Sequence, residues 1–398
     1  MGKALIIIVL GFSVIFGGMM FNLSANRQRS ANALVAQYER LIARNAVESI
    51  TNVAAAKLYA DPNWTTGYSN RKYGGASYSV TVTDITGDST YQAKTLRVLT
   101  TVGYANAVDS TESIYIQPAY SYYYFFLNNW APSLDYATGD TLVGPIHTNT
   151  RMRVRGDPVF FGKVTSADAT YQAVLGGDDP KFYGGVVFGT PVIPLPDLAP
   201  LANEGMAGGH TFDQELWLHF NADGSYDYST DGWMTASSEN IVSNNGIIMT
   251  EPGSNQNIHV EGVVNGRVTV FADRDIIIED DITYASNPIN DPNSDDFLGL
   301  VARHRVTIPN NAANSFDVVI HAAIIAHHDE INVPNWDTGG PWGTLTILGS
   351  IVENDFQPYG TATTGYAINH VYDVRLRDQT PPFFPRVPSR IELIYRSN

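Results

Sequence analysis

The order of apolar and polar positions divides the chain at about residue 60. Residues 4–21 are the run ALIIIVLGFSVIFGGMMF, in which Ser13 is the one polar side chain, and no proline occurs before Pro62. This pattern predicts a single helix over about residues 3–60, which would be roughly 85 Å long at ~1.5 Å per residue. A helix of this length is too long to be buried inside one globular domain, and one of its ends is wholly apolar. Lipid or other copies of the same helix must therefore cover that end.

Residues 27–60 are expected to form an amphipathic continuation of this helix. Apolar residues recur there at steps of three and four, which is the periodicity of one helix face: Ala31, Leu34, Val35, Tyr38, Leu41, Ile42, Ala46, Ile50 and Val53. We expect this face to pack on the chain's own head domain.

Residues 61–143 read as a small head with alternating strands. After a linker rich in Gly, Asn and Tyr, segments 77–83, 95–104 and 112–117 alternate between apolar and polar positions with the period of a half-buried strand. The aromatic cluster at 120–130, YSYYYFFLNNW, is expected to form a core plug between two modules.

Residues 144–371 carry a recurring seven-residue pattern with a small residue or Asp at the fifth position. Copies are MRVRGDP (152–158), IHVEGVV (258–264), IIIEDDI (276–282), VVIHAAI (318–324) and LTILGSI (345–351). Such a repeat favours a β-solenoid, and an ordinary β-sandwich stays the alternative. In a solenoid, Val260, Ile278, Ile320 and Ile347 would point inward and stack. Residues 372–398 are expected to form a proline-rich strap.

The predicted fold class is therefore α+β. It combines a long N-terminal helix (1–60, with 1–26 as its apolar half) with a small antiparallel sheet (61–143) and a large all-β body (144–371), before the C-terminal strap.

Charge and cysteine content exclude several function classes. Residues 1–60 carry a net charge of +4, whereas the whole chain carries −16, so the remainder carries −20. So acidic a body would repel nucleic acid. With no cysteine, thiolate catalysis and cysteine-ligated zinc are unavailable. We expect no cofactor and no metal.

Four polar clusters could carry chemistry. The segment His327-His328-Asp329-Glu330 is expected to be a polar surface loop that holds no metal, because neighbouring histidines on a strand face opposite sides. Segments 221–224 and 291–296 resemble incomplete calcium loops and are assigned to Asx turns. Asp273, Asp275, Asp280 and Asp281 form a group that a carbohydrate-active β-helix enzyme would use, but a turn cluster explains them more simply.

The N-terminal run resembles the stalk of type IV pilins. The apolar residues from Ile7 to Leu10 and the glycines at 11, 17 and 18 lie where pilin stalks carry such residues. The chain departs at Leu5, where pilins usually have a Glu that neutralises a neighbour's N-terminal amine. No basic leader ending in Gly is visible beyond Met1-Gly2. A cleaved signal peptide and a plain membrane anchor remain alternative interpretations.

A second resemblance covers the body. Segments 144–167, 264–284, 298–302 and 372–385 are similar to large bacterial pilus-assembly proteins of the PilX type, which join a pilin-like helix to a β-rich body.

These resemblances imply a structural, non-enzymatic subunit of an extracellular type IV pilus-like filament at the cell surface. It would be held in the inner membrane before assembly, with partners in other copies of itself and in the pilus assembly machinery. Surface or glycan ligands are allowed, for adhesion, motility or protection. A minor or tip pilin of a filament or secretion pseudopilus, and a membrane-tethered carbohydrate-active enzyme, are the alternatives. The predicted filament-core or membrane residues are Leu5, Ile6, Ile7, Ile8, Val9, Leu10, Gly11, Phe12, Val14, Ile15, Phe16, Gly17, Gly18, Met19, Met20 and Phe21.

Overall fold

The computed structural model describes residues 2–87, 90, 92–130, 134–388 and 390–397. The chain forms two compact units. Unit 1 comprises residues 1–85, 95–116 and 391–398, and unit 2 comprises residues 86–94 and 117–390. These units differ from the predicted division in three places, because residues 86–94 and the aromatic cluster at 120–130 belong to unit 2 and the chain's last residues belong to unit 1.

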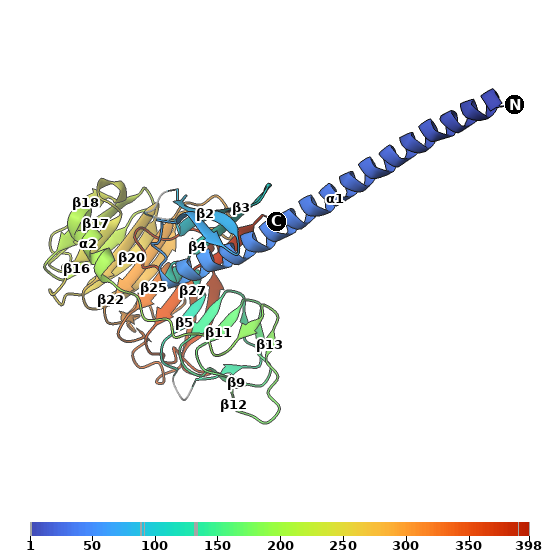
Figure 1. Cartoon of the computed structure of the whole chain (residues 1–398). Helices are drawn as coiled ribbons and strands as arrows, with labels where there is room; N and C mark the ends of the chain where they lie inside the picture. Colours follow the sequence, from blue (N-terminus) through green and yellow to red (C-terminus); the bar gives the residue numbers. More distant parts are fainter. Residues whose placement is uncertain (1, 88–89, 91, 131–133, 389, 398) are drawn as a thin grey trace. The chain divides into compact units, whose positions relative to one another are not determined.

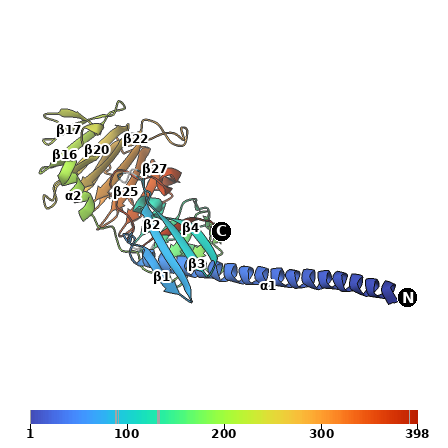
Figure 2. The ribbon, with the colours of Figure 1, turned by 45° about the horizontal axis from the view of Figure 1, so that its top comes forward.

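Unit 1 is built on the predicted helix. Helix α1 (Gly2–Ala60) runs without interruption for 59 residues, so the long N-terminal helix is confirmed. Its N-terminal part extends away from the sheet of unit 1, and its C-terminal part lies along that sheet (Figures 1 and 2). A proline-free sequence permits this length, since each residue can supply its backbone N–H to the helical ladder.

Five strands form the small sheet of unit 1. Its order is β1 (Tyr68–Tyr73), β2 (Ala76–Asp84), β3 (Lys94–Tyr104), β4 (Ala107–Gln117) and β29 (Glu392–Arg396). The pairs β1–β2, β2–β3 and β4–β29 are antiparallel. The three predicted strands are confirmed as β2, β3 and β4. The predicted linker and strap each contain a further strand, β1 and β29.

Alternation in this sheet buries one face against α1. Leu96, Val98 and Val102 on β3 are fully buried, and they share a core with Val47 and Ile50 of the helix. The buried helix residues Ala43, Ala46, Val47, Ile50, Ala54 and Leu58 follow three- and four-residue steps.

Unit 2 is a large β-rich body. Its elements are β5 (Phe125–Leu127), β6 (Tyr136–Ala137), β7 (Thr141–Leu142), β8 (Ile146–Thr148), β9 (Arg153–Arg155), β10 (Val159–Phe160), β11 (Val164–Ser166), β12 (Gln172–Ala173), β13 (Lys181–Phe182), β14 (Val186–Val187), α2 (Ala199–Gly208), β15 (His210–Phe212), β16 (Leu216–Phe220), β17 (Ser225–Ser229), β18 (Ser237–Asn240), β19 (Ile247–Thr250), β20 (Ile258–Val264), β21 (Arg267–Ala272), β22 (Ile276–Tyr284), β23 (Phe297–Ala302), β24 (Val306–Thr307), β25 (Val318–Ala326), β26 (Ile331–Asn332), β27 (Pro341–Glu353) and β28 (Gly365–Tyr372). Short 3₁₀ turns occur at Tyr120–Tyr122, Ile241–Ser243 and Val374–Arg377.

Most strands of unit 2 pair in parallel. One ladder runs β15–β19–β21–β23–β25–β27–β5–β8–β11–β14. A second runs β16–β20–β22–β24–β26, and β28 pairs with the first half of β27. Strands β16, β17 and β18 form an antiparallel excursion. The small antiparallel sheet and the β-rich body are thus confirmed, while the solenoid stays a prediction.

The residues predicted to point inward are all fully buried. Val260 lies opposite Ile278, and Ile320 lies opposite Ile347, whereas the partner of Ile320 on β22 is Ile282 rather than Ile278. The offset arises because β22 pairs with β24 at Ile276 and Ile277 and meets β25 only at Ile282, so the two halves of β22 have different neighbouring strands.

The small fifth residue of the repeat has a steric cause. A Cβ on Gly349 would lie 1.8 Å from the carbonyl oxygen of Ala322, and a Cβ on Gly262 would lie 2.3 Å from that of Phe220. The neighbouring strand approaches so closely at both points that only a residue without a Cβ fits.

The aromatic cluster at 120–130 supplies core to unit 2. The Tyr120 and Phe126 rings meet edge to face at 5.4 Å, and both residues, like Tyr123, are fully buried. The body also contains one element that the sequence analysis missed, helix α2, so it is not purely β.

Candidate assembly surface

The predicted core residues of the N-terminal run lie on the exposed part of α1. The thirteen large apolar side chains among them are between 55% and 75% exposed. An 18-residue window of this helix has a mean hydropathy of 2.3 and none of it is buried, so by length and composition it is able to cross a membrane. We name residues 5–23 of α1 the apolar stalk.

The polar group inside the apolar stalk is satisfied within the helix. The Ser13 hydroxyl donates to the carbonyl oxygen of Val9 at 2.9 Å. No charged side chain occurs between Leu5 and Asn26. Between Leu5 and Phe21, the stalk therefore has no polar side chain that depends on water for a hydrogen bond. This part can enter a dry environment without an unpaired donor or a charge.

The amphipathic half of the helix packs over a shorter length than predicted. Leu34, Val35, Tyr38 and Leu41 are 56–67% exposed, and Val53 is 50% exposed. The prediction that this face packs on the chain's own head from Ala31 onward is wrong, because burial begins at Ala43. The small sheet is too short to reach further along the helix, so apolar side chains stay uncovered in the stalk and, after the polar stretch at residues 26–30, again from Leu34 to Leu41.

The three stalk glycines contact nothing in the single chain. A Cβ added to Gly11, Gly17 or Gly18 would meet no atom within 4 Å. Since glycine lowers helix stability by about 1 kcal/mol relative to alanine, these residues cost helix stability without a packing benefit in the single chain. Close approach of another helix is the benefit that small residues bring in membranes and helix bundles.

The histidine cluster at residues 327–330 lies outside the strands. His327 and His328 lie in a bend after β25, and their rings are 4.9 Å apart, so the strand-alternation reasoning does not apply to them. The His327 Nε2 bonds to the carbonyl oxygen of Pro196 at 2.8 Å. Within the described residues, no cluster of three or more His, Asp or Glu side chains is arranged to hold a metal.

The four carboxylates considered for glycoside chemistry each accept a backbone hydrogen bond. Asp273 accepts from Gly253 and Asn255 N–H and also pairs with Arg303, and Asp275 accepts from Arg305 N–H. Asp280 and Asp281 lie in strand β22 and not in a turn, which corrects the expected turn cluster. Asp280 accepts from the N–H of Asp281, and Asp281 accepts from that of Val319. Local structure therefore occupies these groups.

The two segments resembling calcium loops make Asx turns, as expected. Asp223 accepts from the N–H of Ser225 at 3.0 Å, and Asp291 accepts from that of Asn293 at 3.0 Å. Both carboxylates are turned toward their own backbone.

Comparisons with known proteins find a likeness among solved structures. Neither protein-family models nor curated proteins match the chain. Among solved structures, it is similar to the crystal structure of the competence-associated pilin ComZ from Thermus thermophilus. The identity is 10%, the TM-score is 0.31, and the match covers 90% of this chain and 97% of that chain. At this TM-score the likeness does not decide function, and similarity to the PilX type stays a prediction.

Proposed function

We propose that the protein is a subunit of an extracellular filament of the type IV pilin kind, assembled through its N-terminal helix. The observation that carries the proposal is the exposure of the whole apolar stalk on a continuous helix whose other end is part of a folded head. Exposed apolar surface costs roughly 25 cal/mol per Å². A stalk of this size is therefore covered in the cell, first by the inner membrane and then by other stalks.

The extent of the exposed surface favours assembly over plain anchoring. A membrane anchor needs about 20 apolar residues. Here a second group of uncovered apolar side chains, Leu34, Val35, Tyr38 and Leu41, follows the polar stretch at residues 26–30, beyond the length that lipid requires. Neighbouring helices in a bundle would cover these residues, whereas a lone anchor would leave them in water.

The body provides the surface that such a filament displays. We propose that it is a β-solenoid, which the parallel ladders and the buried inward positions support, and that it serves adhesion, motility or surface protection. The assembly machinery of the inner membrane is the expected partner besides other copies of the chain.

Leu5 favours a minor or tip subunit as a second candidate. Without a carboxylate at this position, the chain offers no ion pair to a neighbour's N-terminal amine. A subunit at the end of a filament has one interface fewer to satisfy. The tethered carbohydrate-active enzyme has less support, because the four carboxylates that it would use are engaged with the backbone.

The test compares the full chain with a chain lacking residues 1–27, both by electron microscopy and by sedimentation. We expect filaments or capped assemblies from the full chain, and soluble monomers with an unchanged melting temperature from the shortened one. Removal of residues 1–41 should leave the head equally stable, since burial begins at Ala43. Filaments from either shortened chain would place assembly elsewhere. Membrane-bound monomers of the full chain would favour the plain anchor.

A further inference from the structure

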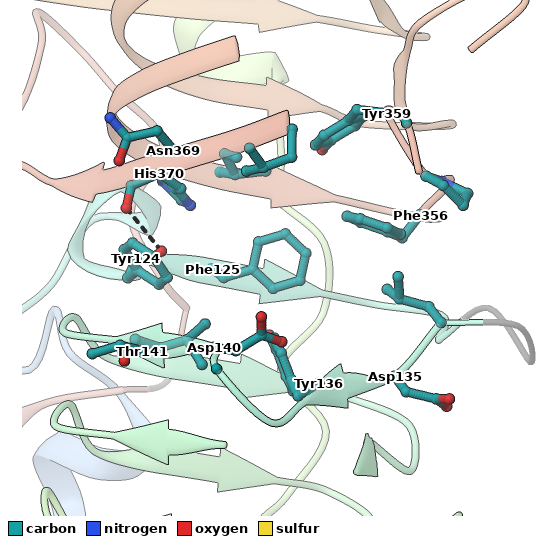
Figure 3. Close-up of a pocket in the computed structure, with 17 residues that line it drawn as sticks. Tyr124, Phe125, Asp135, Tyr136, Asp140, Thr141, Phe356, Tyr359, Asn369 and His370 are labelled. Carbon is teal, nitrogen blue, oxygen red and sulfur yellow. Dashed lines mark hydrogen bonds between the residues drawn. The ribbon is translucent and has the colours of Figure 1, made fainter. Parts of the chain in front are cut away.

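Unit 2 contains a pocket of about 490 Å³ that is unrelated to the apolar stalk. Three parts of the chain line it: residues 124–125 with 134–142, residues 351–360, and residues 368–370 (Figure 3). This volume lies in the range typical of small-molecule sites, which run from roughly 300 to 1,000 Å³.

Aromatic rings form one wall of the pocket at fixed angles. Phe125 and Phe356 meet edge to face at 5.7 Å and 77°, and Phe356 and Tyr359 lie 5.3 Å apart at 49°. Tyr124 and Tyr136 line the pocket as well, and Tyr124 stacks on His370 at 3.9 Å. Each of these rings packs against another aromatic ring, which holds it in place before a ligand binds. Because the rings are inclined to one another, a bound group can contact more than one of them.

The pocket carries one uncompensated negative charge. Asp140 points its carboxylate toward the space beside Phe125 (Figure 3), and its one described partner is the N–H of Ala137 at 2.7 Å. No lysine or arginine lines the pocket, and Asp140 forms no ion pair among the residues that the structure describes. Asp140 as a residue is exposed to solvent, and partial desolvation beside the pocket wall raises the pKa of its carboxyl group. The second lining carboxylate, Asp135, is already paired with Arg153 and Arg155 at 2.7 and 2.6 Å.

The remaining polar groups of the pocket mostly accept hydrogen bonds. Burial lowers the pKa of His370 to about 3, so its ring is neutral. The ring donates to the main chain of Gly349, which leaves Nε2 as an acceptor, and Nε2 is buried without a partner in the described protein. The Tyr136 hydroxyl is likewise buried and unpartnered.

Several other potential donors are used inside the protein, whereas the unpartnered Tyr136 hydroxyl can donate as well as accept. The Tyr124 hydroxyl donates to the carbonyl oxygen of His370, and the Tyr359 hydroxyl donates to Glu353. The Asn369 amide donates to Thr346. A sugar needs both donors and acceptors for its hydroxyl groups, and this lining offers few donors.

We propose that this pocket binds a small organic cation, a choline-sized alkylammonium group. Such a cation has an apolar surface for the Phe125, Phe356 and Tyr359 rings and a positive charge for their faces and for Asp140. The ammonium group of such a cation has no hydrogen-bond acceptor, so the small number of donors in the pocket lining does not disfavour its binding. With this site, the body would bind a ligand of its own. Assembly of the filament through the stalk would not depend on that ligand.

Calorimetric titration of the full chain tests the proposal, with the protein in a polyoxyethylene detergent that carries neither sugar nor ammonium. The probes are choline, its neutral isostere 3,3-dimethylbutan-1-ol, glucose and phosphocholine. We expect choline to bind at least about fivefold more tightly than the isostere, because only the cation gains from the rings and the carboxylate. If phosphocholine binds as tightly as choline, the natural ligand is a choline headgroup. If phosphocholine binds more weakly, the natural ligand is a free alkylammonium compound. Both results support the cation site.

Two variants and a matched control locate the binding. Asp140→Asn keeps the acceptor for Ala137 N–H but removes the charge, and Phe356→Leu removes one ring. Each should weaken choline binding at least about fivefold. Asp280→Asn is the control, since Asp280 is an exposed carboxylate that also accepts a backbone N–H at 2.7 Å and does not line the pocket.

The proposal is overturned by any of four results: equal binding of choline and the isostere, tighter binding of glucose, no binding of choline at millimolar concentration, or equal loss of binding in Asp280→Asn. Circular dichroism of each variant checks that a loss of binding is not a loss of fold.

Discussion

The apolar stalk and the β-rich body use the same kinds of side chain and bury them in opposite ways. Valine, isoleucine, leucine and phenylalanine are 48–75% exposed in the stalk, whereas Val260, Ile278, Ile320 and Ile347 in the body are fully buried. In the body, β20 and β22 alternate over part of their length and β23 is buried along its whole length, in each case by neighbours in the same chain. The stalk is apolar all round, so no packing on its own head could cover it. The difference teaches that apolar content alone does not tell which surface a chain covers by itself.

The largest expected effect comes from a charge in the body. Ile320→Asp buries an unpaired carboxylate between Ile282 and Ile347, and we expect a loss of more than about 4 kcal/mol of folding free energy. The matched control is Ile289→Asp, at a side chain 61% exposed, which should change stability by less than about 0.5 kcal/mol. Thermal melting measures both. Similar melting temperatures for the two variants would contradict the burial that defines the body.

A charge in the stalk should have the reverse outcome. Val14 is 73% exposed, so Val14→Asp should leave the melting temperature of the head unchanged. It should nevertheless abolish filaments, because the carboxylate would be unpaired in a dry helix bundle at a cost of several kcal/mol per copy. Gln28→Asp, beyond the stalk, is the control and should assemble. Electron microscopy reads the filaments, and normal yield from Val14→Asp would rule out a buried stalk.

The body also contains a buried acid whose effect depends on pH. Burial raises the pKa of Glu353 from 4.5 to about 8, and the residue is fully buried. Because the folded state holds this proton more tightly than the unfolded state, the group's stabilisation is complete below pH ~4.5. It is lost as pH rises through about 8. We expect Glu353→Gln to melt near the wild type at pH 4 and above it at pH 9.

Melting curves from pH 4 to 9 measure this difference, with the exposed Glu204→Gln as the control. A constant gap between Glu353→Gln and the wild type at every pH would show that Glu353 ionises normally. The stalk offers no comparable group, since it carries no acid.

The smallest effect should locate the residue of α1 at which burial by the chain's own sheet begins. Ile50 is 3% exposed, and Ile50→Ala should cost unit 1 about 2–4 kcal/mol. Leu41 is 56% exposed, and Leu41→Ala should cost less than about 0.5 kcal/mol. Melting of the detergent-solubilised chain compares them. Equal losses would move the border toward the N-terminus.

The sequence by itself determined the long helix, three strands of the small sheet and the inward positions of the body. Each rests on local information: absence of proline, period-two alternation, or a small residue where strands approach closely. Helix α2 also had a local signal, with Pro200 in its first turn and Gly208-Gly209 at its end, but the surrounding prolines concealed it.

Only the tertiary structure decided where the helix face stops packing, because that depends on the length of the sheet beneath it. It alone paired β29 with β4, since strands far apart in the chain carry no record of their partner. It alone assembled the pocket, whose rings and carboxylate come from three distant segments. Local periodicity specifies which side of an element is apolar. The neighbour that covers that side is chosen by contacts between distant segments, and for the apolar stalk those contacts lie outside the single chain.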